Sequence, residues 1–332
     1  MNDLKQSILK HVFDLADPAG GYPASVHRNW LGIADGSVSE IAPAVYAAEI
    51  AQTLGASLPH PDATAEFIQA RQSRDGFFQN LYPLPGFTTS VYHEYHTCVG
   101  IRGLKALGKS PKYDPREWMI GNIRQIGKGG LFGSYWADFY ANAFAALEER
   151  MPADCERILQ DKLLTFQDAK TGWFIQGGDR HFELNNPMTF HATRVFHLMG
   201  ETVPLADKVL ETFMRVQQSD GSWSLGNMHG TFDACATIRM LSDGSARYAQ
   251  AIEKAGDWAL TCRTDDGGFN HFGDNAPEFR AQDSGNLSDM DACYFQVATL
   301  AIAGRLPMCV DRTNNWIGWG HTLLRSDSQF KV

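Results

Sequence analysis

The sequence predicts an all-α fold, an (α/α)6 toroid in which six helical hairpins close into a ring. Three observations predict it. A short turn of the type (D/T)-G-(G/S)-(F/W) recurs six times at intervals of 42 to 55 residues, and repeats of this period are typical of architectures built from one supersecondary unit. An amphipathic segment precedes each turn, and a uniformly apolar segment follows it. The turns are marked by Gly21, Gly76, Gly130, Gly172, Gly221 and Gly267.

The repeats indicate one toroid domain over residues 1–332, although the length alone would suggest about two domains. We place the six repeats at about 4–56, 62–108, 114–150, 153–201, 205–244 and 247–305. A last apolar segment, Trp316–Leu324, predicts a C-terminal helix that would seal the ring.

The segments before the turns predict outer helices with one apolar face. In the first of them Leu4, Ile8, Val12 and Leu15 recur at helical spacing. The third has a clear start, because Asp114 suits the N-cap position and Pro115 the first helical position.

The segments after the turns predict inner helices that are buried on every side, because they are rich in alanine and apolar nearly all round. All six would run in the same direction, so that their N-termini meet at one mouth of the ring with their partial positive charges. The predicted ranges are 38–54, 91–107, 135–149, 188–199, 231–241 and 289–303.

The turn residues themselves predict scaffold rather than chemistry. Glycine adopts a positive φ at low steric cost, which suits a tight turn between two helices. The aromatic residue that follows would pack under the adjacent repeat. We therefore expect Phe77, Trp173, Trp223 and Phe269 in the core.

Composition excludes several classes of function. A net charge of -9 argues against a nucleic-acid partner, which needs a basic surface. The N-terminus has no basic segment leading into an apolar run, and no stretch approaches 18 apolar residues, so neither a secretory signal nor a membrane span is expected. Six cysteines without a C-x-x-C pair suit reduced thiols, and we expect a cytoplasmic protein.

Ionisable side chains recur near the start of the inner helices. Aligning these helices places His96, His191, Asp233 and Asp291 in one layer near the mouth, with Asp138 nearby. Ionisable groups gathered in a buried site are candidates for perturbed pKa values and for catalysis. Helix capping is the alternative for each aspartate, and for Asp233 taken alone it is the better explanation.

The phrase at residues 216–223, VQQSDGSW, followed by Gly230-Thr231-Phe232 at the start of an alanine-rich helix, resembles the repeat of the terpenoid cyclases. The same repeat marks the β-subunits of protein prenyltransferases. The resemblance extends over all six units and implies the toroid fold. It implies an activity less directly, because toroids of this type also include carbohydrate-active enzymes and proteins that only bind a ligand.

Residues 288–293, SDMDAC, resemble the D-x-D-D motif of class II terpenoid cyclases, with Ala292 in place of the last aspartate. The resemblance implies that Asp291 is a general acid that protonates an olefin or epoxide, with Asp289 and Asp233 tuning it. His96 and His191 would complete the polar layer. The implied function is an enzyme, an isomerase, transferase or lyase, that acts on an apolar isoprenoid-like small molecule in the central cavity without a cofactor.

A second resemblance implies zinc instead. Residues 291–294, DACY, and 95–98, YHTC, resemble the zinc-binding segments of prenyltransferase β-subunits, which implies Asp291, Cys293 and His96 as ligands. His96 lies two repeats around the ring from Asp291, whereas in that family the histidine follows one repeat later. That family also needs a helical partner subunit, and the sequence leaves open whether this chain has a protein partner.

Two other functions stay open on the sequence. Histidines and carboxylates of the loops at the mouth, with aromatic platforms, would suit a carbohydrate-active lyase or hydrolase. A non-catalytic toroid that binds a small ligand is the third alternative. The histidines are His27, His93, His181, His229 and His271, and the candidate platforms are Tyr22, Trp30, Tyr82 and Tyr92.

Overall fold

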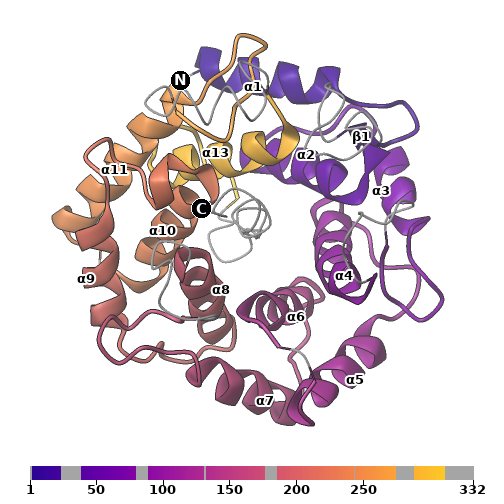
Figure 1. Cartoon of the computed structure of the whole chain (residues 1–332). Coiled ribbons are helices and arrows are strands. Elements are labelled where there is room, and N and C mark those ends of the chain that lie inside the picture. The colour runs from indigo at the N-terminus through magenta and orange to yellow at the C-terminus, as the bar shows by residue number, and fades with distance from the viewer. Residues whose placement is uncertain are drawn as a thin grey trace, which may run out of the picture.

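The computed structural model describes residues 2–23, 39–79, 89–130, 132–175, 185–242, 244–273 and 288–310. Its helices form two concentric rings (Figure 1), which confirms the predicted all-α toroid. Each helix of the inner ring packs against the next, and the last packs against the first, so the ring is closed. The inner helices are α2 (Ile41–Thr53), α4 (Thr89–Ala106), α6 (Ser134–Ala146), α8 (Asn185–Leu198), α10 (Met228–Leu241) and α13 (Met290–Ile302).

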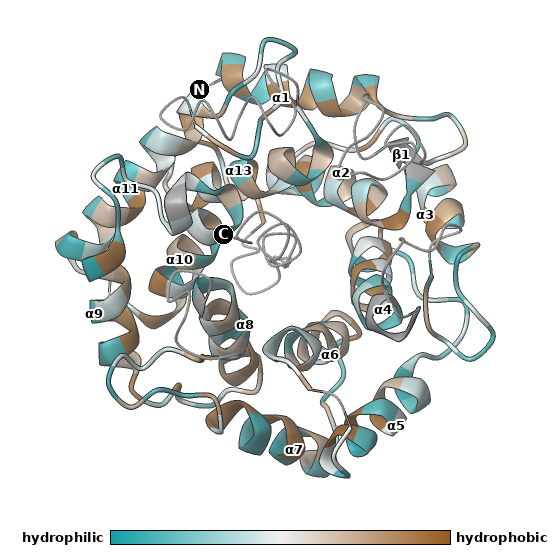
Figure 2. Ribbon diagram, viewed as in Figure 1, coloured by the Kyte–Doolittle hydropathy of each residue, from teal (hydrophilic) through white to brown (hydrophobic). Residues whose placement is uncertain are grey.

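The outer ring consists of amphipathic helices, polar on the face that points away from the ring (Figure 2). In α7, for example, Cys155, Leu159 and Leu163 are buried at helical spacing, whereas every residue of α13 is buried. The outer helices are α1 (Asn2–Asp14), α3 (Pro61–Gln69), α5 (Arg116–Gly127), α7 (Ala153–Leu164), α9 (Ala206–Val216) and α11 (Ala246–Thr261).

A little other regular structure accompanies the helices. The short strands β1 (Tyr22–Pro23) and β2 (Ser39–Glu40) pair antiparallel, with Tyr22 opposite Glu40. The 3-10 turn η3 (Ser224–Gly226) leads into α10. No helix in the described part of the chain is long and apolar enough to cross a membrane. The C-terminal helix predicted at Trp316–Leu324 lies outside the described residues.

The turn between an outer and an inner helix locks each repeat onto the next. In the fifth repeat the amide nitrogen of Gln217 donates to the carbonyl of Gly221 in its own turn and to the carbonyl of Ala251 in α11, both at 2.9 Å. Gln72 and Gln167 make the equivalent pair of bonds in their repeats. The glutamine of the repeated phrase therefore joins neighbouring repeats, a role that the sequence alone did not indicate.

The ring closes through contacts between the last turn and the first helix. His11 Nδ1 lies 3.2 Å from the carbonyl oxygen of Asp266, and His11 Nε2 lies 2.9 Å from Ser288 Oγ. Ser288 Oγ also donates to Asp266 Oδ2 at 2.7 Å. The sixth repeat thus contacts the first as the other repeats contact their neighbours.

Three details of the predicted turns are wrong by one residue. In the first and third turns the positive φ belongs to Gly20 and Gly129, not to the marker glycines Gly21 and Gly130. In the second turn Phe78 is fully buried, whereas Phe77 is only partly buried and stacks on His93. The predicted core positions of Trp173, Trp223 and Phe269 are confirmed, since all three are fully buried.

The third outer helix also starts one residue later than predicted. Pro115 occupies the N-cap position of α5, and Asp114 precedes it. Asp114 nevertheless accepts a hydrogen bond from the backbone nitrogen of Arg116 at 3.0 Å. Such shifts of one residue are ordinary at helix ends, because several residues can satisfy the same free N–H groups.

Replacing Gly221 with Ala is expected to lower the free energy of unfolding by about 2–3 kcal/mol, measured by urea denaturation. The residue has a φ of 98°, and an added Cβ would lie 2.4 Å from the carbonyl oxygen of Lys254. Gly129→Ala is the matched control, because Gly129 has the same kind of φ (97°) but no described atom within 4 Å of its Cβ position. Equal losses in the two variants would contradict close packing of the turn on the next repeat.

Candidate active site at the mouth of the ring

The inner helices run in parallel and bring their first turns together at one end of the ring. Asp138 of α6 contacts His191 of α8, and His229 of α10 contacts Asp291 of α13. Each residue lies within the first two turns of its helix, so neighbouring helices start at the same level. The mouth therefore gathers ionisable side chains from several repeats.

Asp291 lies in the first turn of α13 and is almost fully buried, with 4% of its surface exposed. Its Oδ2 atom lies 3.1 Å from His229 Nε2, and its Oδ1 atom has no hydrogen-bond partner among the described residues. His229 is held in place because Asn227 caps α10 and accepts from the backbone nitrogen of His229 at 2.9 Å. One carboxyl oxygen of Asp291 is thus anchored and the other is not.

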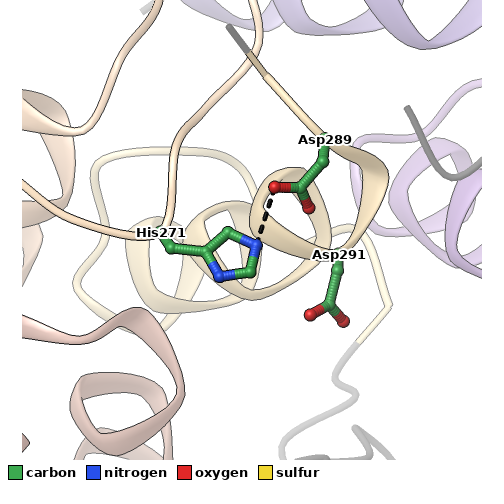
Figure 3. A group of neighbouring side chains, drawn as sticks. All are labelled: His271, Asp289 and Asp291. Carbon is green, nitrogen blue, oxygen red and sulfur yellow. Dashed lines mark ion pairs between the residues drawn. The ribbon is translucent and has the colours of Figure 1, made fainter. Parts of the chain in front are cut away.

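Asp289 precedes Asp291 and has a structural task. It is the N-cap residue of α13, and its Oδ1 accepts from the backbone nitrogen of Ala292 at 2.7 Å. Its Oδ2 lies 2.7 Å from His271 Nε2, and this ion pair is the dashed line in Figure 3. Helix capping, the alternative considered for each aspartate, therefore applies to Asp289, which at the same time orients His271.

His271, Asp289 and Asp291 form one compact cluster with the composition of a metal site. One ligand atom from each lies within 4.8 Å of the others, and all three residues are buried. This cluster shares Asp291 with the zinc ligands that the resemblance implies, Asp291, Cys293 and His96, and its other two members are His271 and Asp289. The Cys293 thiol is buried, which raises its pKa well above the usual range. His96 is buried on α4, with its ring 5.3 Å from that of Tyr95.

Asp138 organises a second buried cluster on the opposite side of the ring. Its Oδ2 lies 2.5 Å from His191 Nδ1, and its Oδ1 accepts from Arg194 Nε and from Asn142, both at 2.7 Å. Burial opposes ionisation of Asp138, but Arg194 and His191 outweigh it and lower its pKa. Burial lowers the pKa of His191 to about 4, so this imidazole is neutral near pH 7.

Asp233 is buried on α10 and neither carboxyl oxygen has a hydrogen-bond partner among the described residues. Burial raises its pKa well above the usual range, and the nearby charges of Arg194 and Asp138 act in opposite directions. It does not cap α10, which starts at Met228. The capping explanation is therefore wrong for Asp233, whose carboxyl group is buried inside the protein.

A third cluster, which was not predicted from the sequence, joins α2, α4 and α13. Arg102 donates to both carboxyl oxygens of Glu49, at 2.8 Å and 2.9 Å from Nη2, and the Tyr294 hydroxyl donates to Glu49 at 2.6 Å. Glu49 and Arg102 are 1% and 3% exposed. Part of the signal was present, because Glu49 is the only charged residue of α2 and buried charges are normally paired.

Glu94→Gln is expected to remove a pH dependence of stability. Burial raises the pKa of Glu94 to about 7, against an ordinary value near 4.5. The folded state thus holds the proton more tightly, and the resulting stability is full below pH 4.5 and is lost as the pH rises to 7. Because Glu94 is partly exposed, we expect the loss to be about 1–3 kcal/mol in urea denaturation at pH 5 and pH 8.

The control for this measurement is Glu66→Gln, on the exposed face of α3. The free energy of unfolding of this variant should change between pH 5 and pH 8 as it does in the unmodified protein. If the free energy of unfolding of Glu94→Gln differs between pH 5 and pH 8 as much as that of the unmodified protein, a group other than Glu94 causes the pH dependence.

The loop residues proposed for carbohydrate binding are only partly described. Tyr22 is fully buried, so it cannot serve as a sugar platform. His229 and His271 are buried partners of Asp291 and Asp289 rather than solvent-facing loop residues. His27, Trp30, Tyr82 and His181, and the side chain of Tyr92, lie outside the described part of the chain.

Comparison with known proteins agrees with the fold. The sequence model of the prenyltransferase alpha-alpha toroid domain matches residues 132–319, more than half of the chain. Among solved structures, the apo form of the type II terpene cyclase MstE from Scytonema matches with a TM-score of 0.59 and 12% identity, covering 95% of this chain and 98% of that chain. No curated protein sequence matches significantly.

Two further solved structures are similar over most of their length. An aspartate-to-alanine variant of MstE in complex with its product, merosterolic acid A, has a TM-score of 0.54 and 13% identity, with 95% of this chain and 97% of that chain covered. A protein from Actinoplanes has a TM-score of 0.55 and 13% identity, with 92% and 98% covered. At these identities the similarity shows the fold alone.

Proposed function

Since the chain belongs to the prenyltransferase alpha-alpha toroid domain family, we propose that it is a terpenoid cyclase-like enzyme in which Asp291 protonates an isoprenoid-like substrate. The observation that carries the proposal is the environment of Asp291. Its carboxyl group is buried in the first turn of α13, with one oxygen held by His229 and the other without a hydrogen-bond partner among the described residues. The free oxygen is the one that would carry the proton to the substrate.

The proposed step is a proton transfer from Asp291 to a carbon–carbon double bond. The π electrons of the double bond form the new C–H bond, and the electrons of the O–H bond stay on Asp291 as a carboxylate. The N–H group of His229 stabilises this carboxylate as it forms, as preorganised donors do for developing charge. The positive charge passes to the substrate, where further double bonds of the same molecule can attack it.

Aromatic rings next to Asp291 suit a cationic intermediate. Phe295 lies one turn further along α13, with its ring 4.4 Å from His229 and 5.2 Å from Phe232. Tyr46 stacks on Tyr294 at 4.3 Å between centroids. The negative faces of such rings attract a cation without reacting with it, by about 0.5–2 kcal/mol each. They would stabilise a carbocation while excluding water that would quench it.

The test is incubation of the purified protein with squalene, geranylgeranyl diphosphate and geranylgeraniol, followed by gas chromatography and mass spectrometry. Cyclic isomers of a polyprenyl substrate would support the proposal. Oligosaccharides belong in the same panel, because their cleavage would favour a carbohydrate-active lyase or hydrolase. Binding of a panel member without any product would favour the non-catalytic toroid.

Zinc is the second candidate, because a cation could use His271, Asp289 and Asp291 together. A bound metal would supply a Lewis acid at the place where the first proposal needs a proton. The proton-transfer proposal predicts that cyclisation survives dialysis against a chelator, with metal content measured by elemental analysis. Activity that is lost on chelation and restored by zinc, but not by magnesium, would replace it with the metal proposal.

A further inference from the structure

We propose that Tyr135, His191 and Asp233 form a binding site for a hydroxyl group, and therefore that the substrate is an isoprenoid chain that carries an alcohol or a phenol. The conversion of this substrate rests on the proposed function, whereas the binding site for the hydroxyl group does not. The three residues come from α6, α8 and α10, which are consecutive in the inner ring (Figure 1). The polar atoms in question are Tyr135 Oη, His191 Nε2 and both carboxyl oxygens of Asp233.

None of these polar atoms has a hydrogen-bond partner in the described part of the chain, although all are buried. A buried polar group without a partner costs about 1–3 kcal/mol, and native proteins contain few of them. Three in one place are therefore most simply explained by a ligand that pairs with them.

Two of the three side chains are in contact, and the third lies within electrostatic reach of one of them. The rings of Tyr135 and His191 are 4.3 Å apart between centroids. Burial is the main cause that raises the pKa of Tyr135, and the negative charge of an ionised Asp233 would raise it further. Asp233 therefore lies near enough to Tyr135 for the two groups to interact electrostatically. The Tyr135 residue as a whole is partly exposed although its hydroxyl is buried, so a ligand can approach along its ring.

The protonation states of the three groups match a hydroxyl group. Asp138 accepts a hydrogen bond from His191 Nδ1–H, which leaves His191 Nε2 as an acceptor. Burial raises the pKa of Asp233 well above its usual range, which favours the protonated form that donates, and the Tyr135 hydroxyl, whose pKa is also raised by burial, donates as well. A hydroxyl ligand has one hydrogen to give to His191 and two lone pairs to accept from Asp233 and Tyr135.

The same groups do not suit a diphosphate. The charge of the neighbouring cation, Arg194, is balanced by Asp138, which binds its Nε and Nη2 atoms, while Nη1 has no hydrogen-bond partner among the described residues. Negative charge next to Asp233 and Asp138 would lack compensation in a buried site, which is costly. A neutral polar group is therefore the better ligand.

The site also lies in a useful place relative to Asp291. In the closed inner ring α6 is three helices away from α13 in either direction, so Tyr135 and Asp291 belong to opposite walls (Figure 1). His229, the partner of Asp291, lies between them and its charge acts on His191. A substrate held by its hydroxyl end at α6 and α8 would extend its chain across the ring toward the acid.

The test is a binding measurement that needs no turnover. Calorimetry would compare farnesol, a farnesylated phenol, farnesylamine, farnesyl diphosphate and the hydrocarbon farnesene on the full chain. Tyr135→Phe removes one oxygen that has no described partner, so it should not disturb folding. We expect it to weaken binding of farnesol or of the phenol about 3- to 10-fold, the usual value of one neutral hydrogen bond, and to leave farnesene within 2-fold.

Asp233→Leu is the second variant and should also weaken binding of farnesol or of the phenol. Tyr248→Phe, on the outer helix α11, is the matched control and should leave binding unchanged. An equal loss for farnesol and farnesene would overturn the proposal. The proposal would also be overturned if farnesyl diphosphate or farnesylamine bound more tightly than farnesol and if that binding were weakened by Tyr135→Phe. If farnesol binding depends on Tyr135 but no prenyl compound is converted, the cyclase proposal fails and the hydroxyl site stands. If Asp291 proves essential for cyclisation while Tyr135→Phe changes nothing, the reverse holds.

Discussion

Asp291→Asn is expected to lower kcat/KM for the cyclised substrate by about 100- to 10,000-fold, the range in which general acids contribute. Asparagine keeps the size of the side chain and can still accept the hydrogen bond from His229, 3.1 Å away. It cannot, however, deliver a proton to a double bond. The loss should therefore appear in kcat, with little change in KM, when product formation is followed by gas chromatography.

The control for this variant is Asp207→Asn, the same substitution at a residue on the exposed face of α9. Both variants should have the Tm of the unmodified protein within about 2 °C, because an exposed substitution usually changes stability by less than 0.5 kcal/mol and Asp291 keeps its partner. An Asp291→Asn protein that folds and retains full activity would exclude Asp291 as the acid. Asp233, another buried carboxyl group at the mouth, would then be the next candidate.

Arg102→Met is expected to lower the free energy of unfolding by about 3–5 kcal/mol, because it leaves Glu49 buried without its cationic partner. The pair is 1% and 3% exposed and is bidentate, so water cannot replace the lost guanidinium. Natural domains are stable by only about 5–15 kcal/mol, so the variant should be close to unfolding at room temperature. Urea denaturation monitored by circular dichroism measures the loss.

A double variant separates the pair from the packing around it. Glu49→Met combined with Arg102→Met replaces both charges with apolar chains of similar length, and we expect it to recover most of the stability lost in the single variant. The charged pair would then be a source of specificity at the junction of α2, α4 and α13. A double variant that is less stable than Arg102→Met would show that the pair itself stabilises the ring.

The fold could be predicted from the sequence because its signal is local and repeated. The turn at Asp220-Gly221 is recognisable from the residues alone, and six such turns at similar intervals leave few architectures open. Phe77 and Phe78 show the limit of this signal. Two adjacent aromatic residues satisfy the same pattern, and only the packing against the neighbouring helix decides which of them is buried.

The candidate site could be predicted only in part. Alignment of the inner helices placed His191 and Asp291 near the starts of their helices, and each contacts a side chain from the first two turns of a neighbouring inner helix. It could not pair them with Asp138 and His229, because a pairing depends on how each helix is rotated about its axis. The loop residue His271 was harder still, because its position next to Asp289 is set by the backbone between two helices.

The contact of His11 with Asp266 and Ser288 has a consequence for how the molecule loses its structure. An open array of repeats has two end units with only one neighbour each, and it can fray from those ends or melt in stages. Here every repeat has a neighbour on both sides, so no unit can detach without breaking two interfaces. Unfolding should accordingly be a single cooperative transition, with the outer helices and the polar mouth lost at the same denaturant concentration.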